Sequence, residues 1–155
     1  MTDPSRQAWS QTNLGDEADG YLFTFASGDR IVLSDEDLQG ACRFADRRRE
    51  FRGQFRELFE KIDHWVNANL EKIDRVHLSF APKGIDLTVV RKGLAFDREF
   101  NRSLTRLDIE VARDERFNLI DFHVMVLPFS AESTVRSFVG PDEFMRRDNQ
   151  DPADA

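Results

Sequence analysis

The sequence has 155 residues, of which 40% are hydrophobic and 33% are charged, with a formal net charge of −7. The length fits one domain with its own core, and the composition is that of a globular chain rather than a disordered one. The negative charge opposes binding to nucleic acid or to an anionic membrane surface. No apolar run could span a bilayer, no secretory leader is visible, and the one cysteine, Cys42, cannot form an internal disulfide. The sequence therefore predicts a soluble cytoplasmic protein.

Charge is distributed unevenly along the chain. Residues 1–37 hold eight acidic and two basic residues, whereas residues 38–61 hold seven basic and four acidic ones. The first twenty residues are mostly polar, with Trp9 as their one aromatic residue, and the last eight are mostly polar as well, which is typical of mobile chain ends. The predicted organisation is a flexible acidic arm over 1–20, a single domain over 21–147 and a disordered tail over 148–155.

A β-hairpin followed by a long helix is predicted for the first half of the domain. Two aromatic and β-branched runs, 21–25 and 30–33, flank a Gly28-Asp29 turn, which indicates a hairpin. Ser34 precedes three acidic residues and predicts a helix N-cap, and Gly40 or Gly53 can mark a bend in the helix that follows over 35–72. One helical face of this segment collects the apolar residues Phe44, Phe51, Phe55, Leu58, Ile62, Trp65, Val66 and Ile73.

The pattern changes to a period of two after Asp74. Apolar residues alternate over 76–80 and again over 85–89, around a Pro82-Lys83-Gly84 turn, which predicts a second hairpin. Residues 91–105 fit a strand extension, a short helix or a packed loop. A third hairpin is predicted from 107–111 and 120–126, with Val111 facing Ile120.

A short helix is predicted near the C-terminus. Ser130 is its expected N-cap, Val135, Phe138 and Val139 are its apolar residues, and Gly140-Pro141 ends it, with room for one more turn over 142–147. The expected fold class is α+β: a mainly antiparallel sheet built from three hairpins, covered on one face by the long amphipathic helix.

The sequence lacks the common catalytic motifs, including phosphate-binding glycine loops, paired CxxC cysteines and nucleophile elbows. One polar cluster arises from the predicted third hairpin, because its register sets Asp108 opposite His123 and Glu110 opposite Asp121. These four residues could bind a divalent cation. His77 and Asp86 would join the same polar face if the second and third hairpins were adjacent. The competing interpretation is a half-solvated sheet with ordinary outward-facing polar residues.

Self-association is the other hypothesis that the sequence raises. The apolar face of the long helix is wider than a sheet needs, and Phe59, Trp65 and Leu70 lie at its margins. On its flank Arg49, Arg52 and Arg56 could contact the acidic run Asp16, Glu17 and Asp19 of a second copy. The alternative is a solvated helix face, with the apolar margin covered by a terminal segment of the same chain.

The sequence thus predicts an adaptor-like protein-interaction domain without catalytic activity and without a cofactor, acting as a homodimer or on another protein. Nucleic acid and membranes are not expected partners. The alternative function is binding of a divalent metal or a small ligand on the polar face of the sheet.

Overall fold

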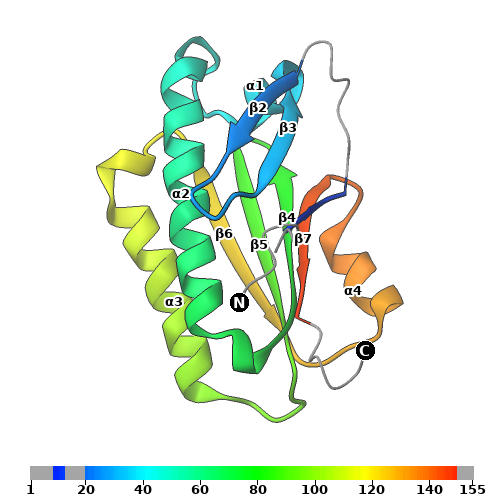
Figure 1. Cartoon of the computed structure of the whole chain (residues 1–155). Helices are drawn as coiled ribbons and strands as arrows, with labels where there is room; N and C mark the ends of the chain where they lie inside the picture. Colours follow the sequence, from blue (N-terminus) through cyan, green and yellow to red (C-terminus); the bar gives the residue numbers. More distant parts are fainter. Residues whose placement is uncertain (1–8, 13–19, 150–155) are drawn as a thin grey trace.

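Five strands form the main sheet of the protein, in the order β1-β7-β4-β5-β6. The computed structural model describes residues 9–12 and 20–149. Within them the protein is an α+β domain of four α-helices and seven strands (Figure 1). Neighbouring strands of the main sheet are antiparallel except β5 and β6, which run parallel. The strands are β1 (Ser10–Gln11), β4 (Ile73–Ala81), β5 (Gly84–Arg91), β6 (Asp121–Leu127) and β7 (Glu143–Asp148).

A helix replaces the first strand of the predicted third hairpin. Helix α3 (Arg98–Arg113) crosses from the end of β5 to the start of β6, as a parallel strand pair requires. Its buried residues Phe100, Leu104, Leu107 and Val111 follow helical spacing, while Ile109, which alternation assigns to the core, is 43% exposed. The third hairpin prediction is therefore wrong. Asp97 caps the helix by accepting a hydrogen bond from the Phe100 backbone at 3.1 Å.

The first hairpin is confirmed, and so is Ser34 as the N-cap of the helix that follows it. Strands β2 (Gly20–Thr24) and β3 (Arg30–Ser34) pair as a separate two-stranded sheet, and the Ser34 side chain accepts a hydrogen bond from the Asp37 backbone. The predicted continuous helix is interrupted, because α1 (Asp35–Ala41) ends at Cys42, whose backbone is extended, before α2 (Arg48–Ala68) begins. The backbone N–H of Arg43 donates instead to the Leu119 carbonyl at 2.8 Å.

The core lies between the main sheet and the layer formed by α2, α3 and the β2-β3 hairpin (Figure 1). Aromatic rings link these parts. Phe55 on α2 lies 4.9 Å from Phe23 on β2 and 5.9 Å from Phe144 on β7, measured between ring centroids. Trp65 of α2 contacts Phe100 of α3 at 5.5 Å.

Helix α4 (Glu132–Val139) covers part of the opposite face of the sheet. Residues of a strand alternate between its two faces, and Val89 of β5 belongs to the main core while Val90 packs with Val135 and Val139 of α4. Gly140 ends α4 with a φ of 74°, as predicted. Ser130 does not cap this helix, because its hydroxyl donates to the Pro128 carbonyl.

Both ends of the described chain are more ordered than the sequence suggested. Trp9 is buried, and its indole N–H donates to Asp63 at 2.8 Å. The helical turn allowed over 142–147 is instead strand β7, which lies between β1 and β4. The Asn149 side chain donates to the Ile73 carbonyl at 3.0 Å. The rest of the predicted arm, 1–8 and 13–19, and of the tail, 150–155, lies outside the described residues.

Replacing Gly84 by alanine should destabilise the protein, because the backbone of the neighbouring strand β6 lies very close to Gly84. A Cβ at this position would lie 1.8 Å from the Asp121 carbonyl oxygen, a backbone atom that cannot move without separating β5 from β6. We expect a loss of about 1–3 kcal/mol or more in the free energy of unfolding, measured by urea denaturation. The control is Gly53→Ala in α2, where a Cβ meets nothing within 4 Å and should stabilise the helix. Equal stability of the two variants would contradict the close approach at Gly84.

Candidate functional site

The four residues of the predicted metal site are not brought together. Asp108 and Glu110 lie on α3, whereas Asp121 and His123 lie on β6. Glu110 pairs with Lys61 at 3.2 Å and Asp121 with Arg43 at 3.6 Å. In residues 9–12 and 20–149, no group of three or more histidine, cysteine, aspartate or glutamate residues could hold a metal ion.

The apolar margins of α2 are covered within the chain. Phe59 stacks on Phe25 at 3.8 Å and meets the ring of Trp9 at 5.2 Å. Trp65 is only 9% exposed, and its indole N–H donates to the Ser103 hydroxyl on α3. Leu70 is half-buried against the core. The prediction of a leftover apolar surface on this helix is therefore wrong, because α3 and the segment around Trp9 occupy it.

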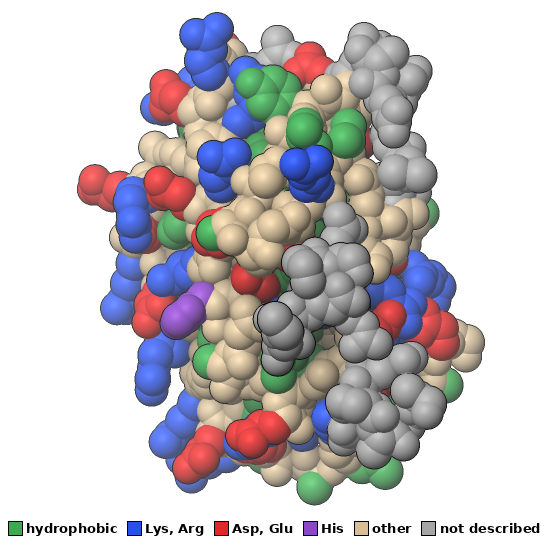
Figure 2. All heavy atoms as spheres, in the orientation of Figure 1, with side chains coloured by type: hydrophobic (Ala, Val, Ile, Leu, Met, Phe, Trp, Pro, Cys, Tyr) green, Lys and Arg blue, Asp and Glu red, His purple; other side chains and the backbone are tan. Residues whose placement is uncertain are grey.

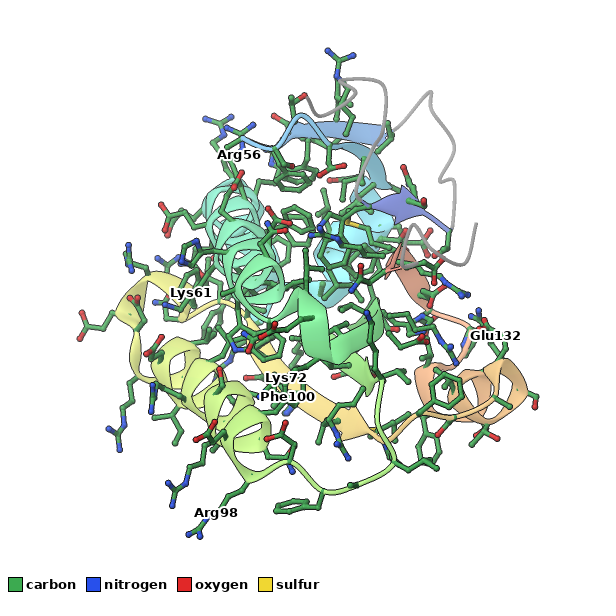
Figure 3. All side chains as sticks on the ribbon, turned by 60° about the horizontal axis from the view of Figure 1, so that its bottom comes forward. Arg56, Lys61, Lys72, Arg98, Phe100 and Glu132 are labelled. Atoms are coloured by element: carbon green, nitrogen blue, oxygen red, sulfur yellow. The ribbon has the colours of Figure 1, made fainter. Side chains whose placement is uncertain are left out.

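The arginines on the flank of α2 lie at the surface. Arg49 and Arg56 are exposed, and Arg56 points away from the sheet in Figure 3, whereas the guanidinium of Arg52 lies 3.8 Å from the centre of the Tyr21 ring. Basic and acidic side chains are intermixed on the face shown in Figure 2. The acidic run expected to contact these arginines lies outside the described residues, so that contact stays a prediction.

The main sheet has two edges of very different length. One edge is β1, which has two residues, and the other is β6, which has seven. Strand β6 contains neither lysine nor proline, and its one carboxylate, Asp121, stands at its first position. Natural proteins protect sheet edges with short strands, lysine, proline or bulges, so β6 lacks the usual sequence devices that discourage a further strand.

The direction of the β6 backbone groups follows from two hydrogen bonds. The N–H of Asp121 donates to the Lys83 carbonyl at 3.0 Å, and the N–H of Phe129 donates to the Gly93 carbonyl at 3.2 Å, both toward the β5 side. Because successive residues of a strand alternate, Phe122, Val124 and Val126 direct their N–H and C=O groups away from β5. Within the described residues, no strand pairs with this outer edge.

A buried histidine-glutamate pair lies between β4 and β7 on the face that carries α4. His77 is 0% exposed and Glu143 is 3% exposed, and the His77 Nδ1 atom contacts the Glu143 carboxylate. Burial raises the pKa of Glu143, but the hydrogen bond and charge of His77, together with the charge of Arg136, outweigh it and leave the pKa below its usual value. Arg136 lies 3.5 Å from the same carboxylate.

Surface arginines continue this network toward α4. Glu132, at the start of the helix, pairs with Arg146 at 2.6 Å and with Arg136 at 3.4 Å (Figure 3). The hydrogen bond from Arg146 lowers the pKa of Glu132. The network joins α4 to β7. Helix α4 buries only two of its residues, Val135 and Val139, so these polar contacts help to hold it against the polar face of the sheet.

A small pocket opens beside this network, between β5, β6 and α4. Its volume is about 180 Å³, and it is lined by Ser79, Asp86, Leu87, Thr88, His123, Val124, Met125, Phe138 and Val139. Asp86 stands next to Ser79 of β4 and next to His123 of β6 in the strand register. The hydroxyl of Ser79 donates to the Val139 carbonyl at 3.3 Å. A polar row thus crosses three strands at the bottom of the pocket.

Part of this site follows from the sequence. Strand alternation placed His77 and Asp86 on one polar face, and it predicted His123 beside them if the strands were adjacent, which β5 and β6 are. Glu143 was missed, because residues 142–147 carry no clear period and the partner of this carboxylate lies 66 residues away in the sequence. The segment Glu143–Asp148 has two adjacent apolar residues between charged ones and no alternation, so it gave no strand signal.

These features define a mixed-sheet α+β domain with a long open edge strand, a buried histidine-glutamate pair and a small polar pocket. No protein-family model matches the chain, and comparisons with curated proteins and with solved structures find no match. No helix within residues 9–12 and 20–149 combines the length and apolar character needed to cross a membrane.

Proposed function

We propose that this protein is a non-catalytic interaction domain that acts as a homodimer, with two copies joined edge to edge through β6. The observation that carries the proposal is the seven-residue outer edge of β6, whose outward backbone groups at Phe122, Val124 and Val126 meet no strand in the part of the chain that the structure describes. Unpaired strand edges are templates for pairing with another chain.

The residues of β6 suit pairing with a second copy of the same strand. In an antiparallel arrangement centred on Val124, Phe122 of one copy lies opposite Val126 of the other, and His123 lies opposite Met125. Such a contact is its own complement under two-fold symmetry, which is the commonest symmetry of homodimers. No like charges face each other, since Asp121 lies at the end of the strand and pairs with Arg43.

The neighbouring flank of α3 offers room for a second copy. Ser103 and Glu110 mark the flank of α3 that faces α2, because they contact Trp65 and Lys61. At 100° per residue, the opposite flank carries the short side chains of Asn101, Thr105, Asp108 and Ala112. Short side chains let two helices approach closely, so pairing of β6 with its copy is compatible with α3 above it.

The proposal predicts a species of about twice 18.0 kDa in sedimentation equilibrium at micromolar concentration. Val124→Pro removes one outward N–H without removing a hydrogen bond to β5, since proline is tolerated on an edge strand. Met125→Lys places a charge on the strand. Each variant should weaken the dimer at least about tenfold, which corresponds to 1.4 kcal/mol. High salt should have little effect, because the contact is not ionic.

Arg49→Ala and Arg56→Ala are the controls, since they test the charged flank of α2 without altering β6. They should leave the dimer unchanged. A single species of 18.0 kDa for the unaltered protein would overturn the proposal. A dimer that weakens with the arginine variants and with salt, but not with Val124→Pro, would also overturn it and favour the α2 flank.

A further inference from the structure

The edge strand β6 carries two side chains with metal-binding atoms on one face, at equal distances from its central residue. His123 precedes Val124 and Met125 follows it, so both side chains lie on the α4 side of the sheet while Val124 lies on the other. Both side chains are exposed, and His123 forms no hydrogen bond or ion pair with the described residues. An imidazole and a thioether sulfur are therefore accessible beside the open edge, but one chain supplies only these two ligands.

The edge-to-edge dimer brings the missing ligands to the same place, so the site rests on the proposed function. When β6 pairs with its copy around Val124, His123 of each copy lies opposite the partner's Met125. The outward backbone groups belong to Phe122, Val124 and Val126, so the histidine-methionine pairs are of the non-hydrogen-bonded kind, in which opposite side chains lie closest. Two histidines and two methionines thus surround the two-fold axis on one face.

The spacing of these four side chains suits a single metal ion. His123 and Met125 of one strand are about 7 Å apart, and neighbouring strands are about 5 Å apart. Each of the four Cα atoms then lies about 4 Å from the two-fold axis in the plane of the sheet, within reach of an imidazole or thioether above it. The side chain of Val124 lies on the opposite face, so no side chain of β6 fills the space between the four ligands.

The ligand types select the metal. Thioether sulfur is a soft ligand that favours Cu(I), and imidazole also binds copper, whereas Mg²⁺ and Ca²⁺ prefer oxygen ligands. Asp86 is the neighbour of His123 in the β5-β6 register, where a carboxylate can accept the second ring N–H of a metal-bound imidazole.

We propose that the β6 edge-to-edge dimer binds one Cu(I) ion on its two-fold axis, through His123 and Met125 of both copies. Since the complete ligand set exists only in the dimer, bound Cu(I) stabilises the dimer relative to the separate chains.

The test is sedimentation equilibrium of the full chain under nitrogen, with and without Cu(I) supplied as its acetonitrile complex. Cu(I) should lower the dissociation constant of the dimer at least about tenfold, and the copper retained after gel filtration should be one ion per two chains. Met125→Leu keeps the size of the side chain but removes the sulfur. It should leave the metal-free dimer unchanged and remove the effect of Cu(I).

Two matched controls retain the site. Met145→Leu changes a buried methionine of β7, and His64→Asn removes an exposed histidine of α2, so both should still bind one Cu(I) per dimer. A dimer that binds no Cu(I), or whose Cu(I) binding survives Met125→Leu, would overturn the site and leave the dimer standing. Binding of one Cu(I) by each separate chain would also overturn it. A single species of 18.0 kDa with and without Cu(I) would overturn the dimer and the site together.

Discussion

Phe55→Ala should lower the free energy of unfolding by about 3–5 kcal/mol, the usual cost of truncating a buried aromatic side chain. Phe55 is buried at the point where three parts of the fold meet, with Phe23 of the hairpin, Phe51 of its own helix and Phe144 of β7 around it. The cavity left by its ring cannot close easily, because these neighbours are anchored in different elements. Urea denaturation followed by circular dichroism measures the effect.

Phe96→Ala is the control for this variant, because Phe96 is a largely exposed phenylalanine between β5 and α3. A surface substitution of this kind should change stability by no more than about 0.5 kcal/mol. A loss below about 1 kcal/mol for Phe55→Ala would contradict the packing of α2 against both sheets.

Glu143→Gln should be the second severe variant, with an expected loss of about 3 kcal/mol or more at neutral pH. The substitution keeps the shape of the side chain but removes the buried carboxylate that contacts His77 and Arg136. Removing one partner of a buried pair of this kind typically costs about 3–5 kcal/mol. Both side chains are buried, and the Nε2 atom of His77 has no other hydrogen-bond partner in the described residues. In the variant the Nδ1 atom of His77 therefore faces a neutral amide, and its Nε2 atom still has no partner among the described residues.

The pH dependence of this effect has a defined sign. The pKa of Glu143 in the folded protein lies below its ordinary value of 4.5, so its carboxylate stabilises the folded state above that pH. This contribution is lost as the pH falls through the lower, folded-state pKa. The difference in stability between the unaltered protein and Glu143→Gln should therefore be largest at neutral pH and shrink in acid. Urea denaturation at a series of pH values measures it.

Glu132→Gln provides the matched control, since Glu132 shares Arg136 and Arg146 with this network but lies at the surface. Solvent screens its pairs, so the loss should stay within about 1 kcal/mol. Equal losses for the two glutamate variants would mean that burial of the His77-Glu143 pair has no energetic consequence.

The sequence was most informative where one local pattern had one interpretation. The hairpin around Gly28 and the β4-β5 hairpin each combine a turn signal with two strand-like runs, and the cap at Ser34 combines a hydroxyl with three acidic residues after it. All three are confirmed. The amphipathic face of α2 is confirmed as buried, since its stripe from Phe51 to Val66 lies in the core. Short-range chemistry determines such elements, so no knowledge of the neighbouring elements is needed.

The errors lie where one pattern had two interpretations. Leu107, Ile109 and Val111 alternate like a strand, yet Leu107 and Val111 also continue a helical spacing that begins at Phe100. Asp97 as a cap and the four-residue step to Leu104 were the signals that could have identified α3. Because the hairpin was wrong, the metal site built on its register was wrong in its geometry too, while the strand residue His123 still reached the polar face beside Asp86.

The parts of the site that sequence alone could not give depend on long-range pairing. Nothing local states that β7 enters the sheet between β1 and β4, so neither the contact of Glu143 with His77 nor the position of β6 at an edge was predictable. Strand order is a property of the whole chain, whereas periodicity reports only on the segment that carries it.

The place of β7 in the sheet also bears on the order of folding. Strand β1 begins at Ser10 and pairs with Arg146 of β7, so the two ends of the described chain must meet before this part of the sheet exists. Pairings between residues distant in sequence form late, because closing a long loop costs entropy before any contact repays it. The β4-β5 hairpin can form as soon as its own residues have left the ribosome, whereas β1 must wait until β7 has been synthesised. During that interval the side of β4 that will receive β7 is itself open, and an unpaired strand edge in a partly folded chain is prone to pair with another chain.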